Sequence, residues 1–297
     1  MNLNLQQGGK PPPAFLPNAG ESVSDGVFSA GHRSETVEAY RTSIERVIQH
    51  MKAHLEEPLD LEQLARIAAI SKFHLVRVFD ELTGTTPHHF LACLRVQRAK
   101  EILLQPDVSI TDVCIQVGYS SLGTFSNTFS SLVGVSPLKF RDMPKRFTVR
   151  DFAWAVKQFL AARRAVPEPL LTGTVEAPPK QRGFVFVGAF DDGVPQGAPF
   201  SGTVMLGPGA FRIQRPQLDE FHLLAVLIPF KARLSAMIAN LPVDLVASMR
   251  VRNLPPRVPF EPRLQLRSLR ATDPPILLAL PPLLRQNTPG FQDALAG

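Results

Sequence analysis

The feature of this sequence that most constrains its fold is an internal repeat between residues 60 and 140. Residues 59–90 and 108–140 match at eleven positions with one inserted residue. The matched residues are small, apolar or identical, at a shift of 49 before the insertion and 50 after it: Leu61/Ile110, Leu64/Val113, Ala65/Cys114, Ala68/Val117, Ala69/Gly118, Leu75/Phe125, Phe79/Phe129, Leu82/Leu132, Gly84/Gly134, Pro87/Pro137 and Phe90/Phe140. Because chance rarely gives eleven matches with one gap, the sequence predicts one supersecondary unit built twice.

Each copy of the repeat has the pattern of a short helix, a tight turn and a second helix. Apolar residues recur at helical spacing in both halves of each copy. In the first copy Ser71 is the expected N-cap of the second helix and Gly84 its C-cap. In the second copy the turn falls at Gly118, and Ser120 or Ser121 is the expected N-cap. Two helices joined in this way form a helix-turn-helix, whose second helix enters the major groove of DNA.

The outward faces of the two second helices carry different chemistry. On the first, Arg77 has the fork geometry that binds the O6 and N7 acceptors of guanine, and Val76 or Phe73 suits a thymine methyl group. The second has no positive charge; Asn127 is its natural reader of adenine, and Thr124 suits several bases. The alternative is that both are solvated faces of two small helical hairpins, but the regularity of the duplication favours the DNA-binding interpretation.

Residues 37–147 resemble the DNA-binding domain of AraC-type (AraC/XylS) transcription regulators. The resemblance rests on the stretch from Ser71 to Gly84, on Pro87 and Phe90, and on the motif Gly118-Tyr119-Ser120-Ser121…Phe125…Phe129…Gly134…Ser136-Pro137…Phe140-Arg141. It implies seven helices, with the two recognition helices in successive major grooves on one face of the DNA. The long helix that joins them is expected from Pro87 to Leu104, which is about 27 Å at the usual rise per residue.

The resemblance also places candidate DNA contacts on this sequence. The base contacts of the family fall on Phe73, His74, Val76 and Arg77 in the first unit and on Leu122, Gly123, Thr124 and Asn127 in the second. For the phosphate backbone we expect Ser71, Lys72, Arg95, Ser121, Lys139 and Arg141, with Lys100 on the joining helix as a further candidate. The family often has Arg at the position of Asn127 and polar residues at those of Leu122 and Gly123, so the second unit is expected to read sequence less tightly.

The distribution of charge suggests modest affinity for DNA in a single copy of the chain. The net charge of +6 divides into −1 for residues 1–35, +2 for residues 36–150 and +5 for residues 151–297. The DNA-binding region is therefore only weakly basic, and its affinity depends on where Lys and Arg lie against phosphate. We therefore expect that tight binding to DNA requires cooperative or homodimeric binding.

Composition limits the class of protein further. The 297 residues, 44% of them hydrophobic, suffice for two domains. No run of about 18 apolar residues predicts a membrane span, and no signal peptide is visible. The two cysteines, Cys93 and Cys114, indicate buried core residues in a reducing compartment, so we expect a cytoplasmic protein.

The residue pattern of the sequence changes from Leu170 on, where short apolar runs alternate with Pro and Gly. These runs predict the strands of a β-rich domain, most simply a sandwich, and residues 231–249 suggest one helix broken at Pro242. The fold class expected is multidomain α + β, an all-α tandem helix-turn-helix domain followed by a β-rich domain. Its divisions are a disordered tail at 1–35, the DNA-binding domain at 36–148, a linker helix at 149–168, the β-rich domain at 169–285 and a disordered tail at 286–297.

No catalytic residues, metal site or cofactor are predicted. His50 and His54 have a spacing that suits zinc on a helix but lack an obvious third ligand, and His222 with Ser201 is better explained as structural. We therefore expect a non-enzymatic transcription regulator that binds double-stranded promoter or operator DNA, with activity set by its C-terminal domain. RNA polymerase, a second copy and an unidentified small effector are candidate partners. The alternatives are a ligand-binding or enzymatic β domain targeted to DNA, and a protein-interaction module.

Overall fold

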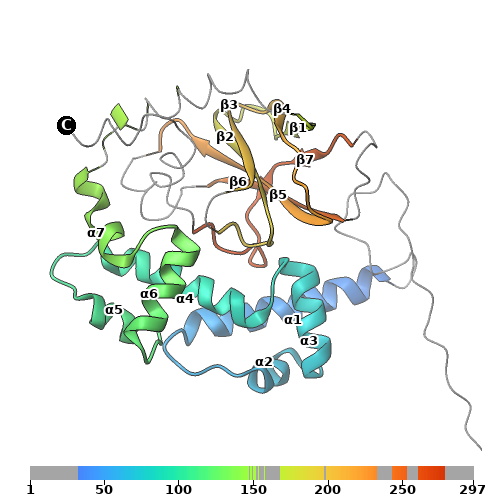
Figure 1. The fold of residues 1–297 in the computed structure, drawn as a ribbon. Helices are drawn as coiled ribbons and strands as arrows, with labels where there is room; N and C mark the ends of the chain where they lie inside the picture. The colour runs from blue at the N-terminus through green and yellow to red at the C-terminus, as the bar shows by residue number, and fades with distance from the viewer. Residues whose placement is uncertain are drawn as a thin grey trace, which may run out of the picture.

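The computed structural model describes residues 33–146, 168–196, 199–232, 243–252 and 260–277, with a few residues between 148 and 157. The expected disordered tails lie almost wholly outside these residues, and the linker helix lies largely outside them. The described helices α1–α7 all precede the described strands β1–β8 along the chain, so the multidomain α + β prediction is confirmed (Figure 1). Among the described residues, none of the helices is both long and apolar enough to cross a membrane.

The N-terminal half contains seven helices among its described residues, the number that the resemblance implies. They are α1 (Arg33–Ala53), α2 (Leu61–Ala68), α3 (Lys72–Thr83), α4 (Pro87–Leu103), α5 (Ile110–Gln116), α6 (Leu122–Val133) and α7 (Pro137–Arg146). The repeat is visible in their limits, since α5 begins 49 positions after α2 and α6 begins 50 positions after α3. The helix α4, which starts at Pro87 and is capped by Thr86, joins the two units as expected.

The C-terminal half contains two sheets. The smaller has the order β4-β1-β7 and the larger the order β3-β2-β5-β6-β8. All neighbouring strands are antiparallel except β1 and β7. The strands are β1 (Leu170–Glu176), β2 (Gly183–Phe190), β3 (Ser201–Leu206), β4 (Gly209–Gln214), β5 (Glu220–Pro229), β6 (Leu245–Arg252), β7 (Arg263–Gln265) and β8 (Arg267–Ser268).

The two sheets form a sandwich, because side chains from both meet in one apolar core. Strand β5 supplies alternate residues to it, from Phe221 to Leu227, and the smaller sheet supplies Leu171 and Phe211. The sandwich prediction is therefore confirmed. One prediction in this region is wrong: residues 245–249 belong to strand β6 and not to a helix. They pair along their whole length with β5, and Leu245 and Ala247 are buried in the sandwich core.

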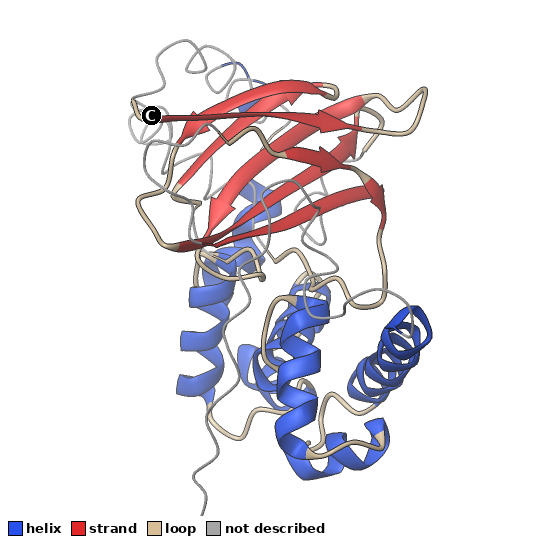
Figure 2. Ribbon diagram, turned by 90° about the vertical axis from the view of Figure 1, so that its right-hand side faces the viewer, coloured by secondary structure: helices blue, strands red, loops and turns tan. Residues whose placement is uncertain are grey.

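The larger sheet is also covered on its second face, by the helices. Val226 and Ile228 of β5 and Val246 of β6 share an apolar core with residues of α4, α5, α6 and α7. Figure 2 shows the sheets stacked over the helices in the same arrangement. The first helix-turn-helix has a separate core, formed by α1, α2, α3 and the first half of α4. The order of layers is therefore small sheet, large sheet, helices.

Candidate nucleic-acid interface

The first helix-turn-helix is fixed by caps at each of its ends. Asp60 accepts a hydrogen bond from the backbone N–H of Gln63 at 2.7 Å and begins α2, and Ser71 accepts one from the N–H of His74 at 3.3 Å and begins α3. Between the helices Ala69 adopts a left-handed conformation with φ of 57°. Helix α3 ends at Gly84, whose own φ is 77°. Ser71 and Gly84 thus have the capping roles that the sequence predicts.

The second unit repeats this construction with different residues. Ser109 caps α5, and of the two serines in the turn it is Ser121 that caps α6, by accepting from the N–H of Thr124 at 3.4 Å. Gly118 holds the left-handed turn position, with φ of 80°, that Ala69 holds in the first unit. A Cβ atom at Gly118 would lie 2.4 Å from the carbonyl oxygen of Leu55, so glycine is required there.

Each recognition helix is anchored to the next helix by one pair of phenylalanines. The rings of Phe79 and Phe90 meet edge to face with centroids 5.4 Å apart, and those of Phe129 and Phe140 do so at 5.6 Å. All four side chains are fully buried. The two helices are therefore held in their cores by the same contact, which leaves the opposite face of each toward solvent.

The exposed face of α3 combines an aromatic ring with a paired histidine and arginine. The side chain of Phe73 is 90% exposed, an unusual environment for such a residue. A guanidinium nitrogen of Arg77 lies 3.3 Å from Nε2 of His74, whose ring also contacts that of Tyr40 at 4.9 Å between centroids. These contacts hold Arg77 and His74 near the N-terminal end of α3, the end that contacts base edges in a helix-turn-helix.

Comparisons with known proteins agree with this geometry. A family model of helix-turn-helix domains matches residues 64–143. The MmsAB operon regulatory protein of Pseudomonas aeruginosa is 40% identical over 93 residues, which are 31% of this chain and 30% of that protein. An HTH-type transcriptional regulator of Staphylococcus aureus is 34% identical over 98 residues, 33% of this chain and 13% of that protein. This region is an AraC-type helix-turn-helix domain.

Two solved structures resemble the AraC-type domain. One, from Chromobacterium violaceum, is described as a transcriptional regulator with an AraC-type DNA-binding domain; it is 29% identical, covers 35% of this chain and 92% of its own, and has a TM-score of 0.34. The other is the DNA-binding domain of AdpA in complex with a target DNA, with 30% identity, coverage of 35% and 96%, and a TM-score of 0.34. The chain spans less than a third of the length of either curated relative named above.

The structure places the predicted base-facing residues of the AraC-type domain together on two surfaces. On α3, Phe73 and Arg77 are exposed and His74 and Val76 are half-buried. On α6, the four predicted residues Leu122, Gly123, Thr124 and Asn127 are all exposed. Their assignment as base contacts stays a prediction, and the absence of a charged side chain from the second set remains its main departure from the family.

Two of the predicted phosphate contacts have other partners in the structure. The guanidinium of Arg95 donates to the carbonyl oxygens of Leu55 and Glu57 at 2.8 and 2.7 Å and lies over the ring of Tyr119. Lys100 has no exposed surface. We therefore leave both out of the candidate interface: Arg95 ties α4 to the end of α1, and Lys100 belongs to the contact with the β domain.

The other predicted phosphate contacts remain accessible. Lys72 and Lys139 are exposed, and Lys72 lies 3.4 Å from Glu62. Arg141 is half-buried and donates to the carbonyl oxygen of Val108 at 3.4 Å. Ser71 and Ser121 are exposed caps whose hydroxyl groups accept from the helix, which leaves their protons available to a phosphate oxygen.

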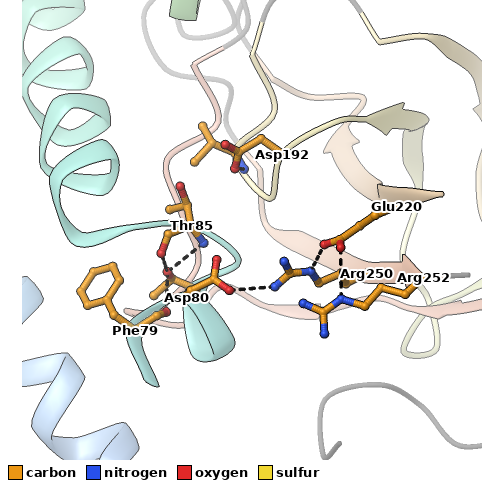
Figure 3. A network of polar contacts seen from close by, with 9 residues as sticks. Phe79, Asp80, Thr85, Asp192, Glu220, Arg250 and Arg252 are labelled. Atoms are coloured by element: carbon orange, nitrogen blue, oxygen red, sulfur yellow. Dashed lines mark hydrogen bonds and ion pairs between the residues drawn. The ribbon is translucent and has the colours of Figure 1, made fainter. Parts of the chain in front are cut away.

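The sequence did not predict the polar contact between the recognition helix α3 and the β domain. Arg250 on β6 donates to Asp80 at the end of α3, at 2.9 Å, and also to Glu220 on β5 (Figure 3). Burial opposes the charge on Arg250, but its hydrogen bonds to Asp80 and Glu220 outweigh this effect and raise its pKa. Arg252 extends the network through Glu220 at 3.3 Å. A charged residue on α3 opposite an arginine in a strand gives no periodic signal, so sequence patterns alone could not reveal the pair.

A close backbone approach accompanies this network. A Cβ atom on Gly193 would lie 2.4 Å from the carbonyl oxygen of Gly84, so the loop after β2 packs directly on the end of α3. His222 lies beside the same turn, and burial together with the charge of Arg250 lowers its pKa. His222 thus packs at the contact between the two domains.

The remaining candidates for chemistry have structural roles. The hydroxyl of Ser201 donates to the carbonyl oxygen of Gln214 at 2.6 Å. Cys93 and Cys114 are buried free thiols, and burial raises the pKa of each. His54 pairs with Glu57 at 2.8 Å, and no cluster of three or more potential metal ligands occurs within the described part of the chain.

Proposed function

We propose that this chain is a sequence-specific DNA-binding transcription regulator whose two recognition helices, α3 and α6, dock in successive major grooves. The observation that supports the proposal best is the duplicated geometry: two equivalent helices, each fixed by the same caps and the same phenylalanine pair, present exposed N-terminal faces. The joining helix α4 has 17 residues and is therefore about 25 Å long. That length is comparable to the ~34 Å of one duplex turn.

In this proposal the two recognition helices contribute unequally to sequence selectivity. Arg77 supplies a bidentate contact to guanine, and Phe73 an apolar contact to a thymine methyl. Helix α6 presents only Leu122, Thr124 and Asn127 beside a glycine, so its contribution is mainly shape and backbone contact. The protein then depends on a second binding event for tight binding, which agrees with the net charge of only +2 in this half.

The β domain sets the activity by its contact with the DNA-binding half. It touches the first unit at Asp80 and the second through the core that includes Val226 and Ile228. A change in the sandwich is therefore transmitted to both recognition helices. We favour this regulatory role over an enzymatic one because Ser201 and His222 are engaged in structural contacts. Dimerisation, contact with RNA polymerase and a cytoplasmic location remain predictions.

The test compares three variants of the full chain in which one positive charge is removed. Genome-wide binding in cells supplies the sites, and gel shifts on those sites and on random DNA give the affinities. Arg77→Ala is expected to lose ~1–3 kcal/mol on the cognate site and to relax the choice at one base position, because a bidentate base contact disappears. Lys72→Ala is expected to weaken binding to all sequences alike and to reduce the salt dependence.

Arg212→Ala is the matched control, since Arg212 is exposed on β4 in the sheet that faces away from the helices. It should leave both affinities unchanged. If Arg77→Ala binds cognate and random DNA as the parent chain does, α3 does not read bases through Arg77. If the full chain selects no site at all, the DNA-binding proposal itself fails.

A further inference from the structure

A cavity lies where the β domain meets the DNA-binding half. It has a volume of about 220 Å³. One wall comes from α1 and α4, with Lys52, Leu94 and Gln97, and the other from the segment after β8, with Arg270 and Ile276. Since both domains supply walls, the cavity exists only in the docked arrangement.

The two cationic side chains on the cavity wall have no direct hydrogen-bond or ion-pair partner among the described residues. Asp273, which also lines the cavity, accepts two hydrogen bonds from Arg267 at 2.7 and 2.8 Å and one from the backbone N–H of Arg270 at 2.7 Å. The charge of Asp273 is therefore already compensated by Arg267 and by this backbone N–H group. Within the described residues, the ammonium of Lys52 and the guanidinium of Arg270 have neither a hydrogen bond nor an ion pair.

The surroundings of Arg270 favour an incoming anion. Burial is the main cause that lowers the pKa of this guanidinium, and the charges of Arg267 and Arg41 add to the effect, which outweighs the opposing charges of Asp273 and Glu38. An anion placed between Lys52 and Arg270 would relieve this repulsion, and each hydrogen bond to it would be charge-assisted. A neutral ligand would gain neither benefit.

Apart from Gln97 and Asp273, the rest of the wall is apolar and limits the shape of the ligand. Phe90 and Leu94 of α4 are buried, and Val243 and Ile276 face them from the β domain. Ligand sites usually measure ~300–1,000 Å³, so a cavity of about 220 Å³ suits a compact molecule. A polar end and an apolar body in one small space are the marks of a site for an amphiphilic molecule.

We propose that this cavity binds a small organic carboxylate with a short apolar body, the carboxylate between Lys52 and Arg270 and the body against Leu94 and Ile276. The ligand would stabilise the docked arrangement, because it contacts walls from both domains. Its effect on transcription rests on the function proposed above, whereas binding to the cavity does not.

The direct test is calorimetric titration of the full chain with hexanoate and with 3-phenylpropanoate. At least one should bind saturably, while the uncharged hexanamide and inorganic phosphate should bind at least tenfold more weakly. Arg270→Gln and Lys52→Gln should each weaken carboxylate binding about tenfold to a hundredfold, the loss expected for a charge-assisted hydrogen bond. Gln97→Trp, which fills the cavity without changing its charge, should abolish binding. Arg212→Gln on the outer sheet should have no effect.

Several outcomes would overturn the proposal. Saturable binding of neither carboxylate would do so, as would equal affinity for phosphate, since then the apolar wall plays no part. Unchanged binding by Arg270→Gln and Lys52→Gln would place the carboxylate elsewhere. A gel shift with Arg77→Ala separates this proposal from the function proposed above: loss of DNA binding with intact carboxylate binding assigns the defect to α3 alone. Carboxylate binding that leaves DNA affinity unchanged would remove the regulatory link and retain the site.

Discussion

Lys100 is buried at the contact between the two halves of the chain. We predict that replacing it by methionine raises the free energy of unfolding at low pH and lowers it at high pH. The side chain has no exposed surface; its ammonium donates to the carbonyl oxygen of Leu277 at 3.1 Å and lies 5.6 Å from the centre of the Phe140 ring. Burial lowers the pKa of Lys100 from 10.5 to about 7. Methionine has a similar length and no charge, so Lys100→Met removes this titration with little change of volume.

The magnitude follows from the difference between the two pKa values. At 1.36 kcal/mol per pH unit, holding Lys100 charged in the folded protein costs about 5 kcal/mol. Because the folded-state pKa is depressed, this penalty is fully present below about pH 7, decreases as the pH rises, and vanishes above 10.5. Methionine avoids the penalty but leaves the Leu277 carbonyl without its donor, which costs about 1–3 kcal/mol at every pH.

Lys100→Met should therefore stabilise the protein by about 2–4 kcal/mol at pH 6 and destabilise it by up to about 2 kcal/mol at pH 10, where a little of the charging penalty remains. Urea unfolding of the full chain, followed by circular dichroism at intervals from pH 6 to pH 10, gives the difference between variant and parent. Taking the difference cancels the titration of all other groups. Lys139→Met, at an exposed position on α7, is the matched control for the loss of a lysine side chain and should not reproduce the stabilisation at pH 6. A flat profile for Lys100→Met would show that Lys100 is solvated in both states.

Two further predictions concern the turn of the repeat and the contact between the domains. Gly118→Ala should lower the free energy of unfolding by at least about 2 kcal/mol, since its Cβ meets the Leu55 carbonyl and its φ is positive; Ala69→Gly at the equivalent turn should change it by less than about 1 kcal/mol. Equal effects in urea unfolding would contradict this account of the turn. A double-mutant cycle with Asp80→Ala and Arg250→Ala should give a coupling of about 0.5–1.5 kcal/mol, because the pair is only partly exposed. Zero coupling would show that the domains do not dock through this pair.

The helical half of the fold could be predicted because the sequence states it twice. Most matched positions are buried in both copies, and the paired rings of Phe79 with Phe90 recur as Phe129 with Phe140. The gap in the alignment falls in the turn, where Ala69 and Gly118 share the left-handed conformation. A repeat of this kind carries information about tertiary contacts, because the two copies bury most of the same positions independently.

The contact between the halves could not be predicted in detail, although one signal of it was present. Strand β5 has apolar residues at nearly every position and not at alternate positions, a pattern of strands covered on both faces. The structure uses both sets: Leu223 and Leu227 face the sandwich, while Val226 and Ile228 face the helices. The pattern thus indicates that something covers the second face, but it does not say what. Lys100 was misassigned for a similar reason, since a lysine on a helix gives no sign that Leu277, far along the chain, and Phe140 will cover it.

In the function proposed above, the position of the β domain bears on how a signal would reach the DNA-binding half. The domain does not cover the exposed ends of α3 and α6; it holds the far end of α3 through Asp80 and packs against the core of the second unit through Val226 and Ile228. Steric exclusion of DNA is therefore not the mechanism that this arrangement favours. The relative orientation of the two units is what the contact fixes, since each unit is attached to the same sheet. In the proposed function two helices fit successive grooves at once, so a small rotation between them would weaken binding without any change in the residues that touch DNA.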